Sequence, residues 1–291
     1  MEFLLTLVNG LSLGGIYAMI ALGYTMVYGI AKMLNFAHGD VIMAGGYTMF
    51  VTLSLMGNPL LAIIAAILFC VILGVTIEKL AYKPLRGAAS LAVLITAIGM
   101  SYLLQSLAQI LFGSSPKMLS ALKIDGALTL GAFRIDYSTL LTLGITVIVM
   151  VGLTLFIKLS KTGRAMIAVS EDRDAAILMG INTNRIITIT FAIGSALAAI
   201  AAYLMLSKAP SLSNTLGAMP GIKAFTAAVI GGIGSIPGAM IGGILLGVIE
   251  SLCTSVPALA PFVDAIEFSL LIILLMVRPN GILGVKRREK V

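Results

Sequence analysis

Two uncharged apolar runs, Tyr137–Ile157 and Ile187–Ser207, constrain the fold of this chain more than any other feature. Each run is 21 residues long, and about 20 apolar residues in a helix are enough to cross a hydrocarbon core of ~30 Å. The segment that separates them, Lys158–Ile186, carries eight charged residues and is called the polar segment below. Five of the eight are basic, so the positive-inside rule predicts a cytoplasmic loop between two membrane spans.

The composition extends this prediction to the whole chain. Of the 291 residues, 59% are hydrophobic and 11% are charged, and the mean hydropathy is +1.11. A soluble domain carries about 25% charged residues. We therefore predict an all-α fold, a polytopic transmembrane helical bundle that forms one domain over residues 1–291.

The formal net charge of +7 is explained by sidedness and does not indicate binding to nucleic acid. Fourteen of the nineteen Lys and Arg residues fall on the predicted inner side, and five fall on the outer side. This asymmetry is what the positive-inside rule expects. The inner set includes Lys32, Arg86, Arg278, Lys286, Arg287 and Arg288, and the outer set is Lys117, Lys123, Arg134, Lys208 and Lys223.

The remaining apolar runs predict eight to ten membrane segments, with a count of about nine and the N-terminus outside. Gly57-Asn58-Pro59 divides the uncharged run Val41–Ile77 into a hairpin of two spans. Met1-Glu2-Phe3 brings no basic region before the first run, which favours a retained span over a signal peptide. The other predicted spans are Phe3–Ala31, Leu91–Phe112, Ala224–Ser235, Ala239–Thr254 and Phe268–Val277.

Several connections and contacts between these spans can also be predicted. Glu78–Arg86 is predicted to be an inner loop, and Gly113–Asp136 an outer segment that forms a small hairpin or an amphipathic helix. Glycines four residues apart let helix backbones approach closely in lipid. Such pairs are Gly10 and Gly14, Gly238 and Gly242, and Gly243 and Gly247.

The glycine-rich stretch Gly231–Gly238 interrupts the last third of the chain. The run before it, Ala224–Ser235, is too short for a straight span, which predicts a discontinuous helix. Irregular backbone at membrane depth is tolerated only where protein or a water-filled cavity surrounds it. Gly231–Gly238 is therefore a candidate element of a transport pathway.

A short helix can be predicted inside the polar segment. Ser170 would be its N-cap, and the first turn would hold acidic residues, which the helix dipole favours. Gly180 suits the position after the C-cap. Ala175, Leu178 and Met179 fall at helical spacing and make an apolar face. Such a helix needs a partner surface, either on this protein or, the alternative we favour, on a second protein.

No residue pattern in the sequence supports chemistry on this chain. It has no Gly-x-x-x-x-Gly-Lys-Ser/Thr loop that would hold ATP phosphates. One histidine and two remote cysteines make no metal site, so we expect no cofactor, no metal and no catalytic residue. His38 has Asn35 and Asp40 nearby, which suits either a proton relay or an interfacial turn, and we favour the turn.

Three motifs follow one another along nearly the whole chain. They are Asn35-Phe36-Ala37-His38-Gly39-Asp40, the polar segment around Ser170–Asn182, and Ala227-Ala228-Val229-Ile230-Gly231-Gly232-Ile233-Gly234-Ser235-Ile236-Pro237-Gly238-Ala239. Together, and in this order, they resemble those of a known family, the inner-membrane permeases of branched-chain amino acid ABC transporters, and specifically the shorter permease subunit.

This resemblance implies a multi-pass subunit of a bacterial or archaeal cytoplasmic membrane that supplies half of a translocation pore. A second related permease, two cytosolic ATP-binding subunits and an extracytoplasmic substrate-binding protein would be its partners. It leaves open whether the second permease is a copy of this chain. The coupling residues that contact the ATPase would be Glu171, Asp172, Asp174, Ala176, Leu178, Met179 and Gly180.

The expected pathway is apolar and glycine-rich, which suits aliphatic side chains, but a zwitterionic substrate also needs polar partners. The candidates are Asn35, His38, Asp40 and Ser235, with Gly231 and Gly234 from the break.

Two alternative functions remain. Permeases for urea or short-chain amides share much the same motifs. An ion-coupled secondary transporter would normally carry charges in the middle of its spans, and the central apolar runs of this sequence are uncharged. An intramembrane enzyme is disfavoured by the lack of paired catalytic groups.

Overall fold

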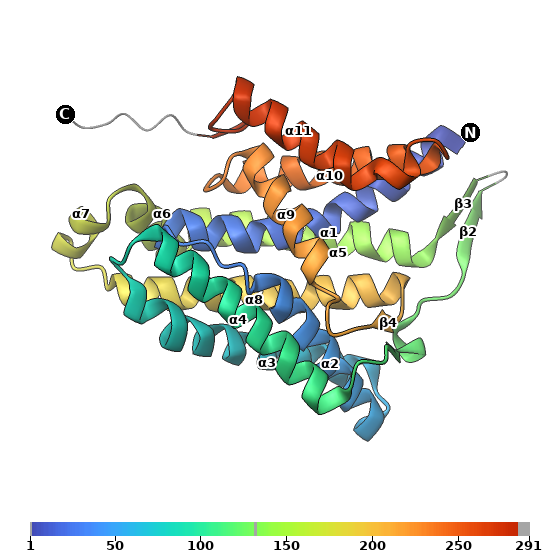
Figure 1. Cartoon of the computed structure of the whole chain (residues 1–291), viewed down its shortest axis with the longest axis horizontal. Helices are drawn as coiled ribbons and strands as arrows, with labels where there is room; N and C mark the ends of the chain where they lie inside the picture. Colours follow the sequence, from blue (N-terminus) through green and yellow to red (C-terminus); the bar gives the residue numbers. More distant parts are fainter. Residues whose placement is uncertain (1, 131–132, 285–291) are drawn as a thin grey trace.

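Long helices account for most of the computed structural model, which describes residues 2–130 and 133–284 (Figure 1). Eight helical segments in these residues are long and apolar enough to cross a membrane, and Ala218–Gly231 is a shorter apolar helix, α9. The predicted all-α bundle of eight to ten segments is confirmed. The long helices are α1 (Glu2–Ala31), α2 (His38–Met56), α3 (Pro59–Ile77), α4 (Ser90–Phe112), α5 (Tyr137–Leu159), α8 (Thr183–Lys208), α10 (Ile236–Ser255) and α11 (Val263–Val277), the last extended by the 3₁₀ turn Ala260–Phe262.

Successive membrane helices alternate in direction, so the two ends of the bundle carry different segments (Figure 1). The start of α1 lies at the same end as strands β2 (Ala127–Leu130) and β3 (Phe133–Asp136), which we call the hairpin end. The short helices α6 (Lys161–Glu171) and α7 (Arg173–Leu178) lie at the opposite end, the polar-segment end. The basic tail Lys286-Arg287-Arg288, which contributed to the predicted sidedness, lies outside the described residues.

The predicted hairpin of two spans forms where its three turn residues place it. Gly57 ends α2 in the left-handed conformation, with φ at 63°, which costs glycine little because it has no Cβ. The Asn58 side chain accepts a hydrogen bond from the Leu60 amide at 2.9 Å, and Pro59 is the first residue of α3. Each residue therefore has the local role that ends one helix and begins the next.

The predicted outer segment, Gly113–Asp136, contains a hairpin, the first of the two predicted alternatives. Strands β2 and β3 pair antiparallel, with Ala127 opposite Asp136. Two shorter strands, β1 (Lys117–Met118) and β4 (Ser211–Leu212), pair at the same end of the bundle. These strands tie the connection after α4 to the connection after α8.

Helices α1 and α10 pack most closely, and glycines make this possible. A Cβ on Gly14 would lie 2.7 Å from the Cα of Ile244, and a Cβ on Gly10 would lie 2.9 Å from the Cα of Val248. Gly243 and Gly247 in α10 face Ala18 and Gly14 in return. The predicted role of these glycine pairs in packing is thus confirmed, because no larger residue fits without moving a backbone.

The prediction of an inner loop at Glu78–Arg86 is wrong. The chain continues from α3 as a π-helical turn, Glu78–Tyr82, and a 3₁₀ turn, Lys83–Leu85. Glu78 is fully buried, forms an ion pair with Arg86 and accepts a hydrogen bond from the Thr188 hydroxyl at 2.9 Å. Because the carboxylate is satisfied inside the bundle, the chain here can remain helical instead of turning out to water.

Candidate functional site

The first candidate site is helix α7, which projects from the polar-segment end (Figure 1). Its N-cap is Asp172, whose carboxylate accepts hydrogen bonds from the amides of Asp174 at 3.1 Å and Ala175 at 3.0 Å. The prediction of Ser170 as the N-cap is therefore wrong. Ser170 lies in the last turn of α6, where its hydroxyl donates to the Ile167 carbonyl. The extended backbone of Asp172 ends α6 and starts α7, so Glu171 belongs to the preceding helix.

The other end of α7 has the predicted glycine cap. Gly180 has φ at 81° and donates to the Ile177 carbonyl at 2.9 Å, while the Ile181 amide donates to the Ala176 carbonyl at 3.0 Å. These two bonds define the Schellman arrangement, which satisfies the last carbonyls of a helix. With a cap at each end, a helix of six residues keeps a defined shape.

The apolar tip of α7 has no contact partner within the described residues of this chain that would cover it. The exposed fractions are 88% for Leu178 and 83% for Met179, and Ile177 is half exposed. Ala176 alone faces inward and is buried. Fully burying one such leucine or methionine would contribute about 1.5–3 kcal/mol. The tip is thus an apolar surface that the described part of this chain leaves exposed.

Helix α6 fixes α7 to the bundle. Ser160 caps it by accepting a hydrogen bond from the Gly163 amide at 2.8 Å, and Gly163 lies directly against the backbone of Ile157 in α5. Met166 and Val169 are buried beneath α6. Through α6, α7 is therefore packed against the end of α5.

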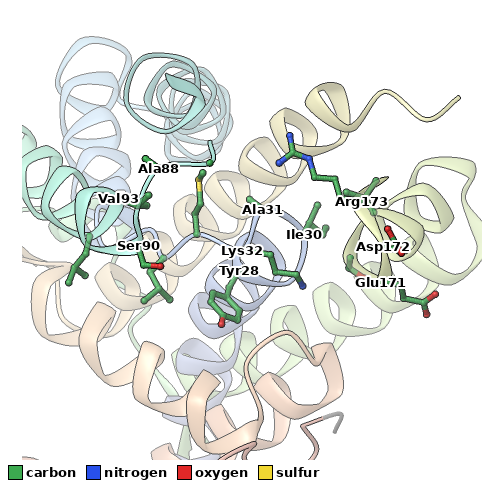
Figure 2. Close-up of a pocket in the computed structure, with 16 residues that line it drawn as sticks. Tyr28, Ile30, Ala31, Lys32, Ala88, Ser90, Val93, Glu171, Asp172 and Arg173 are labelled. Atoms are coloured by element: carbon green, nitrogen blue, oxygen red, sulfur yellow. The ribbon is translucent and has the colours of Figure 1, made fainter. Parts of the chain in front are cut away.

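Beside α7 opens a cavity of about 740 Å³, called the α7-side cavity here. Figure 2 shows Glu171, Asp172 and Arg173 on one side of it, Ala88, Ser90 and Val93 on the other, and the end of α1 between them. Lys32, which follows α1, has φ at 56°, the only positive φ outside glycine among the described residues. A long side chain in this conformation is a strained feature of the kind that gathers at functional sites.

A second cavity of about 320 Å³, the inner cavity, lies further along α4, between α2, α4 and the start of α9. Leu94 lines both cavities, so the two are neighbours. Asp40 contributes the acidic side chain, and the Gln105 amide Nε2 donates to its Oδ1 at 2.8 Å. The other lining residues are Tyr24, Phe36, Gly39, Ile98, Ser101, Tyr102, Gly217, Ala218, Gly221 and Ile222.

The inner cavity exists because α2 begins inside the bundle. The chain turns back after α1, and His38 packs against Gly23, eight residues before the end of α1, or roughly 12 Å along that helix. Gly39 meets the backbone of Gly217 just before α9. The first turns of α2 and α9 therefore face the same space.

The structure does not bring the six predicted pathway residues to one place. Asp40 lines the inner cavity, whereas Asn35 accepts a hydrogen bond from the Tyr82 hydroxyl at 2.9 Å. The His38 ring is buried edge-on against Tyr24, at 4.9 Å between ring centroids. The other three lie elsewhere: Gly231 ends α9, and Gly234 and Ser235 form the turn between α9 and α10.

That turn lies at the polar-segment end. Gly234 has φ at 94°, faces Gly29 near the end of α1, and lines a small cavity of about 50 Å³ together with Ser170. Ser235 caps α10, and the Leu283 amide donates to the Gly231 carbonyl at 2.9 Å. The turn is thus placed next to α6.

The sequence analysis did not predict a cluster of charged residues around Lys223, which it placed in an outer loop. Lys223 is instead a buried residue of α9 and contacts Glu250, Asp264 and Glu267. The polar residues Ser101 and Gln105 were missed as well, although their spacing of four residues in an apolar run marks one helix face.

Comparison with known proteins groups this chain with transport permeases. Residues 6–277 match the model for the permease component of branched-chain amino acid transport systems. The high-affinity branched-chain amino acid transport permease protein BraD of Pseudomonas aeruginosa is 46% identical over 100% of this chain and 98% of its own length. The corresponding LivH protein of Escherichia coli K12 is 43% identical over 99% of this chain.

Two further likenesses are more limited. The fructose import permease protein FrcC of Rhizobium meliloti is 34% identical over 40% of this chain. A solved structure of PsaBC from Streptococcus pneumoniae, in complex with a Fab, has a TM-score of 0.51 at 15% identity and covers 94% of this chain and 91% of its own. That second likeness shows a shared fold alone.

Proposed function

The chain belongs to the permease component family of branched-chain amino acid transport systems, and we propose from this premise how it works. It is the permease subunit of an ATP-driven importer of branched-chain amino acids. It forms half of a translocation pore in the bacterial or archaeal cytoplasmic membrane and couples to a cytosolic ATPase. A second related permease supplies the other half, two cytosolic ATP-binding subunits drive transport, and an extracytoplasmic binding protein delivers the substrate.

One observation carries the coupling role. Helix α7 is capped at both ends, fixed to the bundle through α6, and exposes Leu178 and Met179 at its tip. An exposed apolar tip on a rigid helix fits a groove on a partner, where a few buried anchors hold most of the binding energy. The proposed coupling residues are Asp172, Asp174, Ala176, Leu178, Met179 and Gly180 of α7 and its caps, together with Glu171, the last residue of α6.

The two cavities support the role in forming a pore. They are neighbours that share Leu94, and together they extend from the interior of the bundle to the end that carries α7. Around the inner cavity the side chains of Ile98, Tyr102 and Ile222 are exposed. An apolar rim beside a partly polar cavity suits a second permease that closes the pathway from the other side.

The turn Gly231–Gly238 and the motif Asn35–Asp40 act in the same pathway at two depths. Asp40 faces the inner cavity. Asn35 and His38 hold the re-entrant backbone that places it there. Gly234 and Ser235 form the turn next to α6, where motion of the coupling helix reaches α10.

The test is ATP-driven uptake in proteoliposomes. The chain is reconstituted with the ATPase, the second permease and the binding protein from the same genome, and leucine uptake is measured with and without ATP. We expect uptake that requires ATP and every partner. Uptake by this chain alone, driven by an ion gradient, would replace the proposal with a secondary transporter.

A further inference from the structure

The inner cavity contains one acidic side chain whose known partner is neutral. Asp40 is 2% exposed, and the amide of Gln105 donates to its Oδ1 at 2.8 Å. The same amide nitrogen lies 3.3 Å from the Ser101 hydroxyl. Gln105 thus orients the carboxylate from the neighbouring helix α4, but brings no charge to it.

Other buried acids in the described residues have a basic partner. Glu78 pairs with Arg86, and Glu267 pairs with Lys223. No described Lys or Arg forms an ion pair with Asp40, and no described residue that lines the inner cavity is basic. A carboxylate at membrane depth is costly without a counter-charge, and such residues mark ligand or ion pathways.

The rest of the lining indicates what would bring that counter-charge. Phe36, Leu94, Ile98 and Ile222 surround the space with apolar side chains. A ligand that fits therefore combines an ammonium group with an aliphatic side chain. An ammonium also donates hydrogen bonds that a carboxylate accepts, and charge-assisted bonds of this kind are roughly twice as strong as neutral ones.

We propose that the Asp40 carboxylate, oriented by Gln105, binds the ammonium group of the transported substrate within the inner cavity. The permease itself then selects α-amino acids against carboxylates without an amine and against neutral amides. This inference rests on the proposed function, since it assigns the Asp40 carboxylate as the group that recognises the substrate in the same pathway. It adds a selection step inside the membrane to the selection made by the binding protein.

A purely structural role for Asp40 makes different predictions. Asp40 is the third residue of α2, where the helix dipole favours negative charge. In that role, Asp40→Asn would lower the thermal stability of the protein, and ligand binding would not depend on an ammonium group. The experiment must therefore compare ligands as well as variants.

The experiment measures how ligands protect a thiol in the cavity. Ile222, on the α9 side, is replaced in Ile222→Cys, with Cys253→Ser to remove the more accessible native thiol; Cys70 is fully buried and stays. The assembled complex is labelled with a small thiol reagent in the presence of leucine, 3-methylbutylamine or 4-methylpentanoate. The last two are leucine without its carboxylate and leucine without its amine. Leu128→Cys, in β2 at the hairpin end, is the control.

We expect leucine and 3-methylbutylamine to slow labelling, and 4-methylpentanoate to have no effect at the same concentration. Asp40→Asn should raise the leucine concentration needed for protection by about tenfold or more. Equal protection by 4-methylpentanoate, or unchanged protection by leucine in Asp40→Asn, would overturn the inference. Either result is compatible with continued ATP-driven leucine uptake, whereas absence of that uptake in the parent complex would overturn the proposed function instead.

Discussion

Lys223 in α9 and Glu267 in α11 form an ion pair of 3.2 Å, and the Glu267 side chain has no exposed surface. Glu250 and Asp264 also contact the Lys223 ammonium, at 3.0 Å and 2.8 Å, and the Tyr17 hydroxyl donates to Glu250 at 2.7 Å. The cluster therefore joins α1, α9, α10 and α11. Little of α11 is buried in the bundle, so this cluster is a main attachment of that helix.

Replacing Lys223 should destabilise the protein strongly. Lys223→Met leaves three carboxylates together without their cation, and breaking a buried ion pair in this way costs about 3–5 kcal/mol. The measurement is the thermal unfolding midpoint of the purified protein in detergent. Asp264→Asn is the matched control, because that side chain is 52% exposed and a solvated pair contributes only about 0–1 kcal/mol. Equal midpoints for Lys223→Met and the parent would show that the cluster does not hold α11.

The glycine contacts between α1 and α10 give a second stability prediction. Gly14→Val would force its side chain against the backbone of Ile244, so the helices must separate and lose their packing. We expect a lower yield of folded protein by size-exclusion chromatography and a lower unfolding midpoint. Gly144→Val in α5 makes the same change where no atom lies within 4 Å of the added Cβ, and it should behave like the parent. A normal Gly14→Val protein would contradict the close approach of the two helices.

The sidedness of the bundle can be tested at the polar segment. Glu171 is exposed and caps no helix, so Glu171→Cys in a Cys253→Ser background presents a thiol without disturbing α7. The excess of basic residues in the polar segment predicts a cytoplasmic location. An impermeant thiol reagent should therefore label the thiol only after permeabilisation of the cells. Labelling of intact cells would invert the topology of the whole chain.

The positions of the spans follow from the sequence because hydropathy and turn residues are local signals. The predicted Phe3–Ala31 and Leu91–Phe112 agree with α1 and α4 to within a residue, and Gly57-Asn58-Pro59 makes the predicted turn. The Ser170 cap was wrong because two candidate caps lie two residues apart. The extended backbone at Asp172 decides between them.

The candidate site was harder to predict because its contacts join distant parts of the chain. Asp40 and Gln105 are 65 residues apart, and Glu78 and Thr188 are 110 apart. No local pattern indicates that α2 starts deep enough for Asp40 to face α4. The motif Asn35–Asp40 was predicted as one group, but the fold separates its members. Asn35 binds Tyr82, His38 packs on Gly23, and Asp40 lines the inner cavity.

The tip of α7 provides the most direct test of coupling to an ATPase. Leu178→Asp places a charge where an apolar pocket of the partner is expected, and loss of such an anchor costs about 2 kcal/mol or more. We expect the ATPase to co-purify poorly and substrate-stimulated ATP hydrolysis in proteoliposomes to fall by at least tenfold. Leu178→Met keeps a similar apolar volume and should retain both activities, and Leu128→Asp makes the same charge change at the hairpin end and should retain the ATPase. The permease should insert normally in all three variants, since Leu178 is 88% exposed and Leu128 is 39% exposed, so neither is a core side chain. If Leu178→Asp retains the ATPase and its stimulation, α7 is an ordinary surface helix and coupling must run through another part of the polar-segment end.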